Sequence, residues 1–155
     1  MTYPADLRDL VSMLQILDRS DRIQMLIDIA GRFREVPEDI ARRPYSDQHK
    51  VPACESEAYV WAERGDDADT FTFHFAVDNP QGISAKAMAV ILGEHLSGRP
   101  VTEVASVSGD LVYDVFGREL SMGKSMGLMG MVSMVTQSAK NHLAETRLAE
   151  TSNGS

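Results

Sequence analysis

Cysteine is almost absent from this 155-residue sequence, which contains only Cys54. A lone thiol excludes an internal disulfide, and by itself it cannot form a cysteine metal site. None of the four histidines lies in an H-E-x-x-H pair, and no histidine spacing is typical of a zinc site. We therefore expect neither a disulfide framework nor a bound metal. Cys54 is then either a free nucleophile or a small buried side chain.

Long apolar runs and basic residues are also scarce. No run of roughly eighteen apolar residues occurs, so we expect no membrane span. The first residues lack the basic and apolar regions of a secretory signal, which favours a cytoplasmic location where a free thiol stays reduced. The net charge is −8, from 23 acidic against 15 basic residues, and such a chain repels phosphate backbones. Nucleic acid is therefore not an expected partner.

Two helices are predicted near the N-terminus, over residues 6–17 and 20–31. In each, apolar side chains recur three and four residues apart, which is the spacing of one helix face. Ser20 is the predicted N-cap of the second helix, because a side-chain oxygen there accepts from the free N–H groups of the first turn.

A long loop and a hairpin are predicted in the middle of the chain. Residues 35–52 hold three prolines and few apolar residues, which indicates a loop that leads to Cys54. Alternating residues predict strands over 57–63 and 71–77, joined as an antiparallel hairpin by a polar turn that contains glycine. The aromatic side chains of this hairpin should form a main wall of the core.

Helices dominate the C-terminal half of the chain. Residues 107–117 fit either a strand or a short helix. The order of elements predicts an α+β fold, in which a small antiparallel sheet packs against helices on one face. We expect a single domain over residues 1–145 and a disordered tail over residues 146–155. The other predicted helices in this half span residues 83–96, 102–105 and 125–144.

Glycine and methionine are dense at the start of the final helix. Gly123, Gly127 and Gly130 lie among five methionines between residues 122 and 134. This stretch lacks the spacing of a phosphate-binding loop, so the glycines predict close packing of the helix against a neighbour. The methionines are more typical of a core than of a copper site.

Charged residues of both signs surround Cys54. His49 and Lys50 would favour the reactive thiolate, whereas Glu55 and Glu57 would oppose it. No cysteine-protease signature surrounds the thiol. From these residues alone, a buried inert cysteine and an exposed reactive one both remain open.

The chain resembles the SufE family, the sulfur acceptors of cysteine desulfurases. The family pattern around its cysteine is roughly V-x-G-C-x-S-x-x-W/Y, which Val51, Cys54, Ser56 and Tyr59 fit. The resemblance runs from about residue 7 to residue 140. Its other short motifs are the stretch that ends at Ile27-Asp28-Ile29-Ala30-Gly31, Asp78 with the helix after it, Gly98-Arg99-Pro100, and Ser121 to Gly127 in an S-x-x-R-x-x-G element.

This resemblance implies a SufE/IscU-like fold and a covalent sulfur-transfer role rather than a stand-alone enzyme. Cys54 would accept persulfide sulfur from a SufS-like cysteine desulfurase, activate that enzyme, and pass the sulfur to an iron–sulfur scaffold complex. Pyridoxal phosphate would belong to the desulfurase, and this chain would carry no cofactor. The protein would be a monomer or a homodimer. Its implied partner contacts are Val51, Glu55, Ser56 and Lys124.

Three residues depart from the family pattern, and two other functions remain open. Ala53 replaces a glycine, Glu55 places an acid beside the thiol, and Lys124 replaces an arginine and loses its bidentate contacts. IscU-like scaffolds carry several cysteines, so a single cysteine argues against cluster scaffolding. The alternatives are a non-catalytic binding module of the same fold with a buried cysteine, or a thiol enzyme that acts alone.

Overall fold

A computed structural model describes residues 3–67 and 69–153 of the chain. These residues form six α-helices, one short 3₁₀ helix and one two-stranded antiparallel sheet, which confirms the predicted α+β class. None of the described helices is long and apolar enough to cross a membrane. The helices are α1 (Ala5–Ile16), α2 (Arg19–Ala30), α3 (Ile83–Leu96), α4 (Val101–Ala105), α5 (Leu111–Phe116) and α6 (Met122–Asn153), and η1 is Asp47–His49.

The hairpin separates two groups of buried side chains. Strand β1 (Ala58–Arg64) pairs with β2 (Phe71–Val77), with Ala58 opposite Val77 at one end. Because side chains alternate along a strand, one face joins the main core and the other does not. The face toward the main core carries Ala58, Val60, Phe71, Phe73, Phe75 and Val77.

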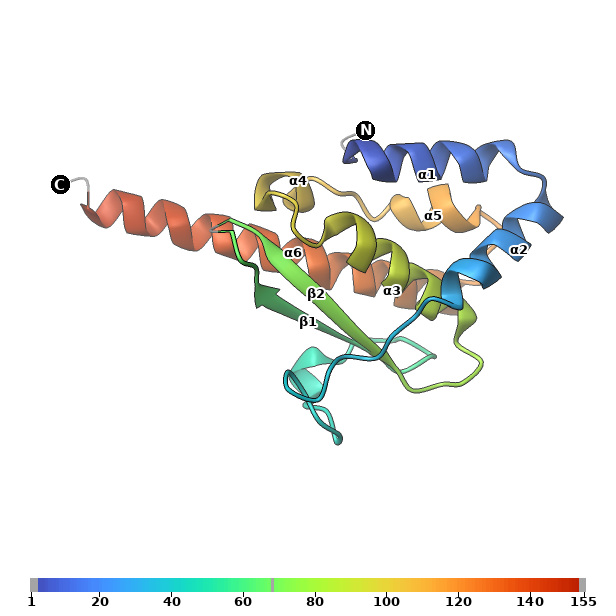
Figure 1. Cartoon of the computed structure of the whole chain (residues 1–155), viewed down its shortest axis with the longest axis horizontal. Coiled ribbons are helices and arrows are strands. Elements are labelled where there is room, and N and C mark those ends of the chain that lie inside the picture. The colour runs from blue at the N-terminus through green and yellow to red at the C-terminus, as the bar shows by residue number, and fades with distance from the viewer. Residues whose placement is uncertain (1–2, 68, 154–155) are drawn as a thin grey trace.

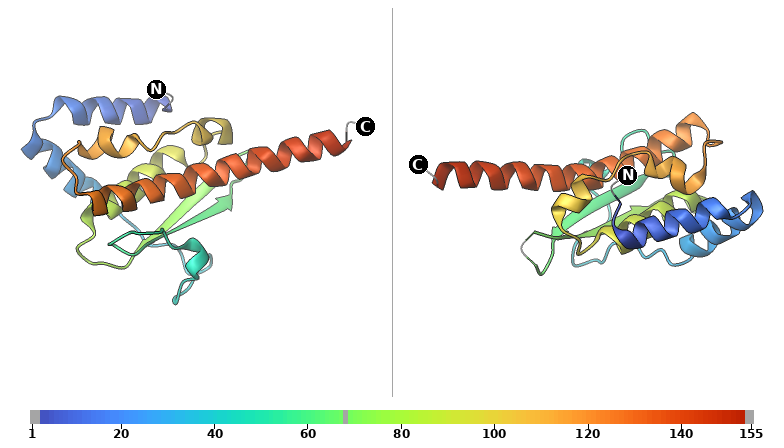
Figure 2. Two further views of the ribbon diagram at one scale, coloured as in Figure 1. Left: turned by 180° about the vertical axis from the view of Figure 1, so that it is seen from behind. Right: turned by 90° about the horizontal axis from the view of Figure 1, so that it is seen from above.

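Helices α3 and α6 pack on the core face of the hairpin (Figure 1). Most of α3 is buried, because it lies between the hairpin and α2. Helix α6 buries an apolar stripe in its first half, and its far end stands clear of the other elements (Figure 2). The buried stripe consists of Leu128, Met131, Val132, Val135 and Ala139.

The opposite face of the hairpin is covered by the predicted long loop. Tyr59 and Trp61 of β1 are buried there, at 8% and 4% exposure. The Tyr45 ring lies 5.2 Å from the Tyr59 ring and 4.9 Å from the Trp61 ring. The loop is also anchored by a backbone hydrogen bond of 2.8 Å from Val36 N–H to Phe75 O. The loop that covers this face leads directly into the segment that contains Cys54.

The predicted N-cap of the second helix was wrong. The N-cap of α2 is Asp18, which accepts a hydrogen bond of 2.8 Å from Asp21 N–H, whereas Ser20 lies inside the helix. Of the two structures that residues 107–117 fitted, the short helix is observed as α5, which buries Leu111, Val112 and Val115 together.

Helix α6 is longer than the sequence predicted at both ends. It begins at Met122, three residues before the predicted start at residue 125, and continues to Asn153 through the expected tail. The chain from 146 to 153 contains neither proline nor glycine, and Leu148, Ala149 and Glu150 are good helix formers. The last two residues of that expected tail lie outside the described part of the chain.

A buried histidine joins α6 to the end of the hairpin. His142 is 8% exposed and its ring meets Phe71 edge-on, with 5.6 Å between centroids. An Arg64 N–H group donates to Nδ1 of His142 at 2.5 Å, and Nε2 lies 3.2 Å from Asp69 Oδ1. Since arginine only donates, Nδ1 accepts from Arg64, and Nε2 is the ring nitrogen that donates to Asp69.

We expect His142→Ala to lower the free energy of unfolding by about 1–3 kcal/mol, because it removes ring packing and two polar contacts. Urea denaturation at constant pH measures this change. Lys140→Ala, an exposed substitution two residues earlier on α6, should stay within about 0.5 kcal/mol of the wild type. Equal stability of His142→Ala and the wild type would contradict the proposed link.

Candidate functional site

Cys54 lies near the tip of a tight loop that immediately precedes β1. Lys50 pairs with Tyr59 in an antiparallel bridge, and Val51 N–H donates to Ala58 O at 2.8 Å. We call residues 51–57 the cysteine loop. Within it, Glu57 N–H donates to Cys54 O at 3.1 Å, which closes a turn around the cysteine.

Left-handed residues shape the cysteine loop on both sides of the thiol. Ala53 has φ +57° and Glu57 has φ +51°, a region in which side chains other than glycine are uncommon. Such a residue costs of order 1 kcal/mol, so the surrounding contacts must hold it. Ala53 is the position at which the family pattern has glycine. The loop therefore stores backbone strain directly before the cysteine.

The cysteine loop rests on three glycines of α6. We call Gly123, Gly127 and Gly130 the glycine face of this helix. A Cβ atom on Gly127 would lie 3.0 Å from Cys54 Cα and 3.2 Å from its Sγ. A Cβ on Gly130 would lie 2.7 Å from a Val51 methyl carbon. The predicted close packing of the glycines is thus confirmed, and the neighbour is the cysteine loop itself.

The turn before α3 forms the opposite wall of the site. Asp78 N–H donates to Glu57 O and Asn79 N–H donates to Ser56 O, each at 3.1 Å. A Cβ on Gly82 would lie 3.0 Å from the Ser56 side chain, so this turn also approaches closely. Backbone hydrogen bonds from the turn and close packing on the glycines of α6 therefore hold the cysteine loop between them.

A cavity of about 340 Å³ lies between these walls. Cys54 lines it, and the thiol is free and partly exposed. The starts of α3 and α6 contribute Ser84 and Lys124 to the lining. Cys54 is therefore neither fully buried nor fully open, and the cavity beside it leaves room for an additional atom on sulfur.

The sequence-predicted residues occupy different places. Glu55 is exposed, and a Cβ on Gly123 would lie 2.2 Å from its Oε1, so the carboxylate rests on the first turn of α6. Ser56 and Lys124 line the cavity with Cys54. Val51 is only 1% exposed, so in this conformation it anchors the loop and offers no surface to a partner.

His49 is directed away from the thiol. Its Nδ1 lies 3.0 Å from Val60 O, which requires that this nitrogen donate. Its ring stacks on Trp61, with 5.1 Å between centroids, in the aromatic cluster on the other face of the hairpin. Among the described residues, no hydrogen bond joins Cys54 to a histidine. His49 is therefore close to Cys54 in the sequence, but it lies on the Trp61 face of the hairpin rather than beside the thiol.

The residues that sequence reasoning missed lie at the start of α3. Ile83 and Ser84 line the cavity, whereas the sequence pattern placed them in a predicted helix without assigning them to the site. The described residues hold no group of three or more histidine, cysteine or acidic side chains that could bind a metal ion. The described site therefore offers the Cys54 thiol, two serine hydroxyls, the Glu55 carboxylate and the Lys124 ammonium group, and no set of metal ligands.

Comparison with known proteins gives matches over most of the chain. A family model described as SufE, Fe-S metabolism associated domain, matches residues 8–139. Among solved structures, the chain is similar to the solution structure of a hypothetical protein from Thermus thermophilus, with a TM-score of 0.72 and 20% sequence identity. That alignment covers 92% of this chain and 98% of the other, and it supports the fold alone. No curated protein matches the chain.

The glycine face generates a test with a matched control. We expect Gly93→Ala in α3 to raise the free energy of unfolding by up to about 1 kcal/mol through helix propensity. A Cβ there would meet a Phe75 ring carbon at 3.5 Å, which is an ordinary contact. Gly127→Ala should fall short of that gain, because Cys54 must move to admit the methyl group. Chemical denaturation of both variants measures the difference.

The same pair should differ in thiol reactivity. Displacing the cysteine loop exposes Cys54, so alkylation by iodoacetamide should be faster in Gly127→Ala than in the wild type. Gly93→Ala should react at the wild-type rate. If both variants gain equal stability and react alike, the loop does not depend on Gly127.

Proposed function

The chain belongs to the SufE family of Fe–S metabolism associated domains, and from this premise we propose that it is a sulfur acceptor for a SufS-like cysteine desulfurase. Cys54 takes persulfide sulfur from the enzyme, and the protein then delivers this sulfur to an iron–sulfur scaffold complex. The observation that carries the proposal is the position of Cys54, the only cysteine, on a strained loop beside a cavity of about 340 Å³.

The transfer is a thiol exchange that requires no external oxidant. The Cys54 thiolate attacks the outer sulfur of the enzyme persulfide, and a new S–S bond forms on Cys54. The S–S bond to the enzyme cysteine breaks, and that cysteine leaves as a thiolate. The transferred sulfur keeps its oxidation state. Pyridoxal phosphate, which generates the persulfide, belongs to the desulfurase, and this chain needs no cofactor of its own.

The docked loop suits the storage step better than the attack. Cys54 Sγ packs against Gly127, so the loop must leave α6 for the thiol to reach a donor on another protein. The loop is held by a few backbone hydrogen bonds, and two of its residues are strained in the docked conformation. Its release therefore costs less than that of a well-packed core segment. After transfer, the cavity gives the outer sulfur a place away from bulk solvent.

The two alternative functions lack comparable support. A binding module with an inert cysteine is expected to bury the thiol, whereas Cys54 is partly exposed. A stand-alone thiol enzyme commonly pairs its cysteine with a base, and among the described residues no histidine bonds to Cys54. Membership of the SufE family also favours a protein that works with a partner enzyme rather than alone.

We expect the protein to gain the mass of about one sulfur atom when it is incubated with a cysteine desulfurase and free cysteine, without reductant. Intact-mass spectrometry measures the gain. Cys54→Ser should show no gain and should no longer stimulate the desulfurase, and its circular dichroism should match that of the wild type. Stimulation that persists in Cys54→Ser, or a gain of mass on that variant, would refute the proposal.

A further inference from the structure

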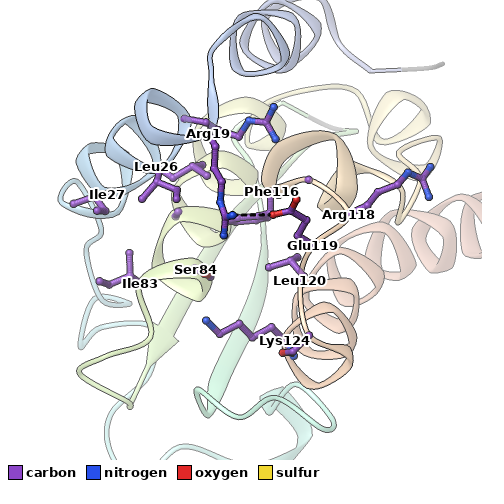
Figure 3. Close-up of a pocket in the computed structure, with 15 residues that line it drawn as sticks. Arg19, Leu26, Ile27, Ile83, Ser84, Phe116, Arg118, Glu119, Leu120 and Lys124 are labelled. Carbon is purple, nitrogen blue, oxygen red and sulfur yellow. Dashed lines mark hydrogen bonds and ion pairs between the residues drawn. The ribbon is translucent and has the colours of Figure 1, made fainter.

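A second and larger hollow adjoins the Cys54 cavity. It has a volume of about 750 Å³ and lies between α2 and α3 on one side and the α5–α6 connection on the other (Figure 3). We call it the adjoining groove. Ile83, Ser84 and Lys124 line both the groove and the Cys54 cavity, so the two hollows are continuous at the start of α3. A molecule seated in the groove would therefore lie beside the thiol.

The groove has an apolar surface that is open to solvent. Ile23, Ile27 and Ile83 are 47%, 42% and 46% exposed, and all three line it. Leu26, Phe116 and Leu120 lie deeper among the lining residues. Single exposed apolar residues are normal on a protein, but a group around one hollow is typical of a binding surface.

The charge of the groove is opposite to that of the whole chain. Four basic residues and one acidic residue, Glu119, line it, although acidic residues exceed basic ones in the sequence. The basic residues are not equivalent. Arg22 donates from Nε to Leu14 O at 3.1 Å. Arg118 points away from the groove in Figure 3, and its guanidinium lies 5.3 Å from the centre of the Tyr113 ring.

Two cations remain available at the groove. Arg19 forms an ion pair of 3.3 Å with Glu119, and both side chains are more than three-quarters exposed at 79% and 77%. An ion pair so exposed to water contributes little and exchanges easily. Lys124 extends toward Ser84 and the start of α3 in Figure 3, and the described residues give its ammonium no ion pair. A carboxylate placed in the groove would therefore find Lys124 unneutralised.

We propose that the adjoining groove docks a segment of the sulfur-donating desulfurase that presents a bulky apolar side chain next to a carboxylate. This inference rests on the proposed function and names the surface that serves it. The apolar side chain packs on Ile23, Ile27 and Ile83, and the carboxylate pairs with Lys124. Because Lys124 and Ile83 also line the Cys54 cavity, docking brings the donor persulfide to the edge of the cysteine loop.

The test measures binding without transfer. The dissociation constant of a SufS-type cysteine desulfurase is measured by isothermal titration calorimetry in a Cys54→Ser background. Ile27→Glu places a charge on the apolar surface but lies outside the Cys54 cavity. We expect it to weaken binding by about tenfold or more, and Arg19→Glu to weaken it less. Thermal unfolding verifies that each variant is folded.

Ile16→Glu is the matched control. Ile16 is an isoleucine at the end of α1, is 84% exposed and lies outside the groove, so its variant should bind like the parent. Parent-like binding by both Ile27→Glu and Lys124→Glu would overturn the docking surface. Equal weakening by Ile16→Glu would also overturn it, because the effect would then come from added negative charge anywhere on the protein.

Other outcomes distinguish this inference from the proposed function. If the wild type gains sulfur but Ile27→Glu binds normally, the carrier function stands and the groove fails. If Ile27→Glu loses binding while the wild type gains no sulfur, the groove stands and the transfer fails. If gel filtration shows that Ile27→Glu converts a dimer to a monomer without affecting the desulfurase, the occupant is a second copy of this chain, and the assignment to the desulfurase is wrong.

Discussion

The contact between the cysteine loop and the glycine face of α6 is the constraint on which the rest of the site depends. A glycine inside a helix costs about 1 kcal/mol relative to alanine, so this helix begins at a disadvantage. Its stability comes from the buried stripe that follows, in which Met131, Val135 and Ala139 are fully covered. The helix is thus weak where it receives Cys54 and strong where it packs on the hairpin.

The opposite side of the hairpin controls where the cysteine loop begins. Residues 36–45 of the long loop cover Tyr59 and Trp61, and this apolar contact is the loop's main attachment. Arg43 adds a second attachment, since it bonds both Glu35 and Asp78. Asp78 also binds the cysteine loop through its backbone N–H. Because Arg43 is about half exposed, at 51%, its ion pairs fix position more than they add stability.

Local periodicity predicted the elements well, because each helix or strand buries one continuous face. The hairpin and α3 follow directly from this pattern, and so does the α+β class. Local pattern was insufficient where long-range packing decides. It left residues 107–117 open between strand and helix, and the burial of Leu111, Val112 and Val115 favours the helix. The prediction of Ser20 as N-cap was wrong, because Asp18 takes that position where the chain turns from α1.

The site was predictable in its chemistry but not in its surroundings. The single cysteine and the glycines are visible in the sequence, and the glycine spacing indicated a close contact. The identity of that contact was not visible, since residues 54 and 127 are far apart in the chain. The sequence left open whether His49 lies near the thiol, because local pattern does not show that Trp61 and Val60 hold it on the other face of the hairpin. The adjoining groove draws on three separate segments, and no local pattern reveals it.

The three departures from the family pattern lie in the cysteine loop and in the first turn of α6, on which Glu55 rests. Ala53 takes a left-handed conformation that glycine would adopt without strain, so it makes the docked loop costlier to hold. Glu55 compensates in part, because its carboxylate rests at the N-terminal turn of α6, where the helix dipole favours an anion. Lys124 offers a point charge where arginine would offer a bidentate contact. In the proposed docking, the single point charge of Lys124 leaves more of the recognition to the apolar side chains of the groove, where Ile23, Ile27 and Ile83 are exposed.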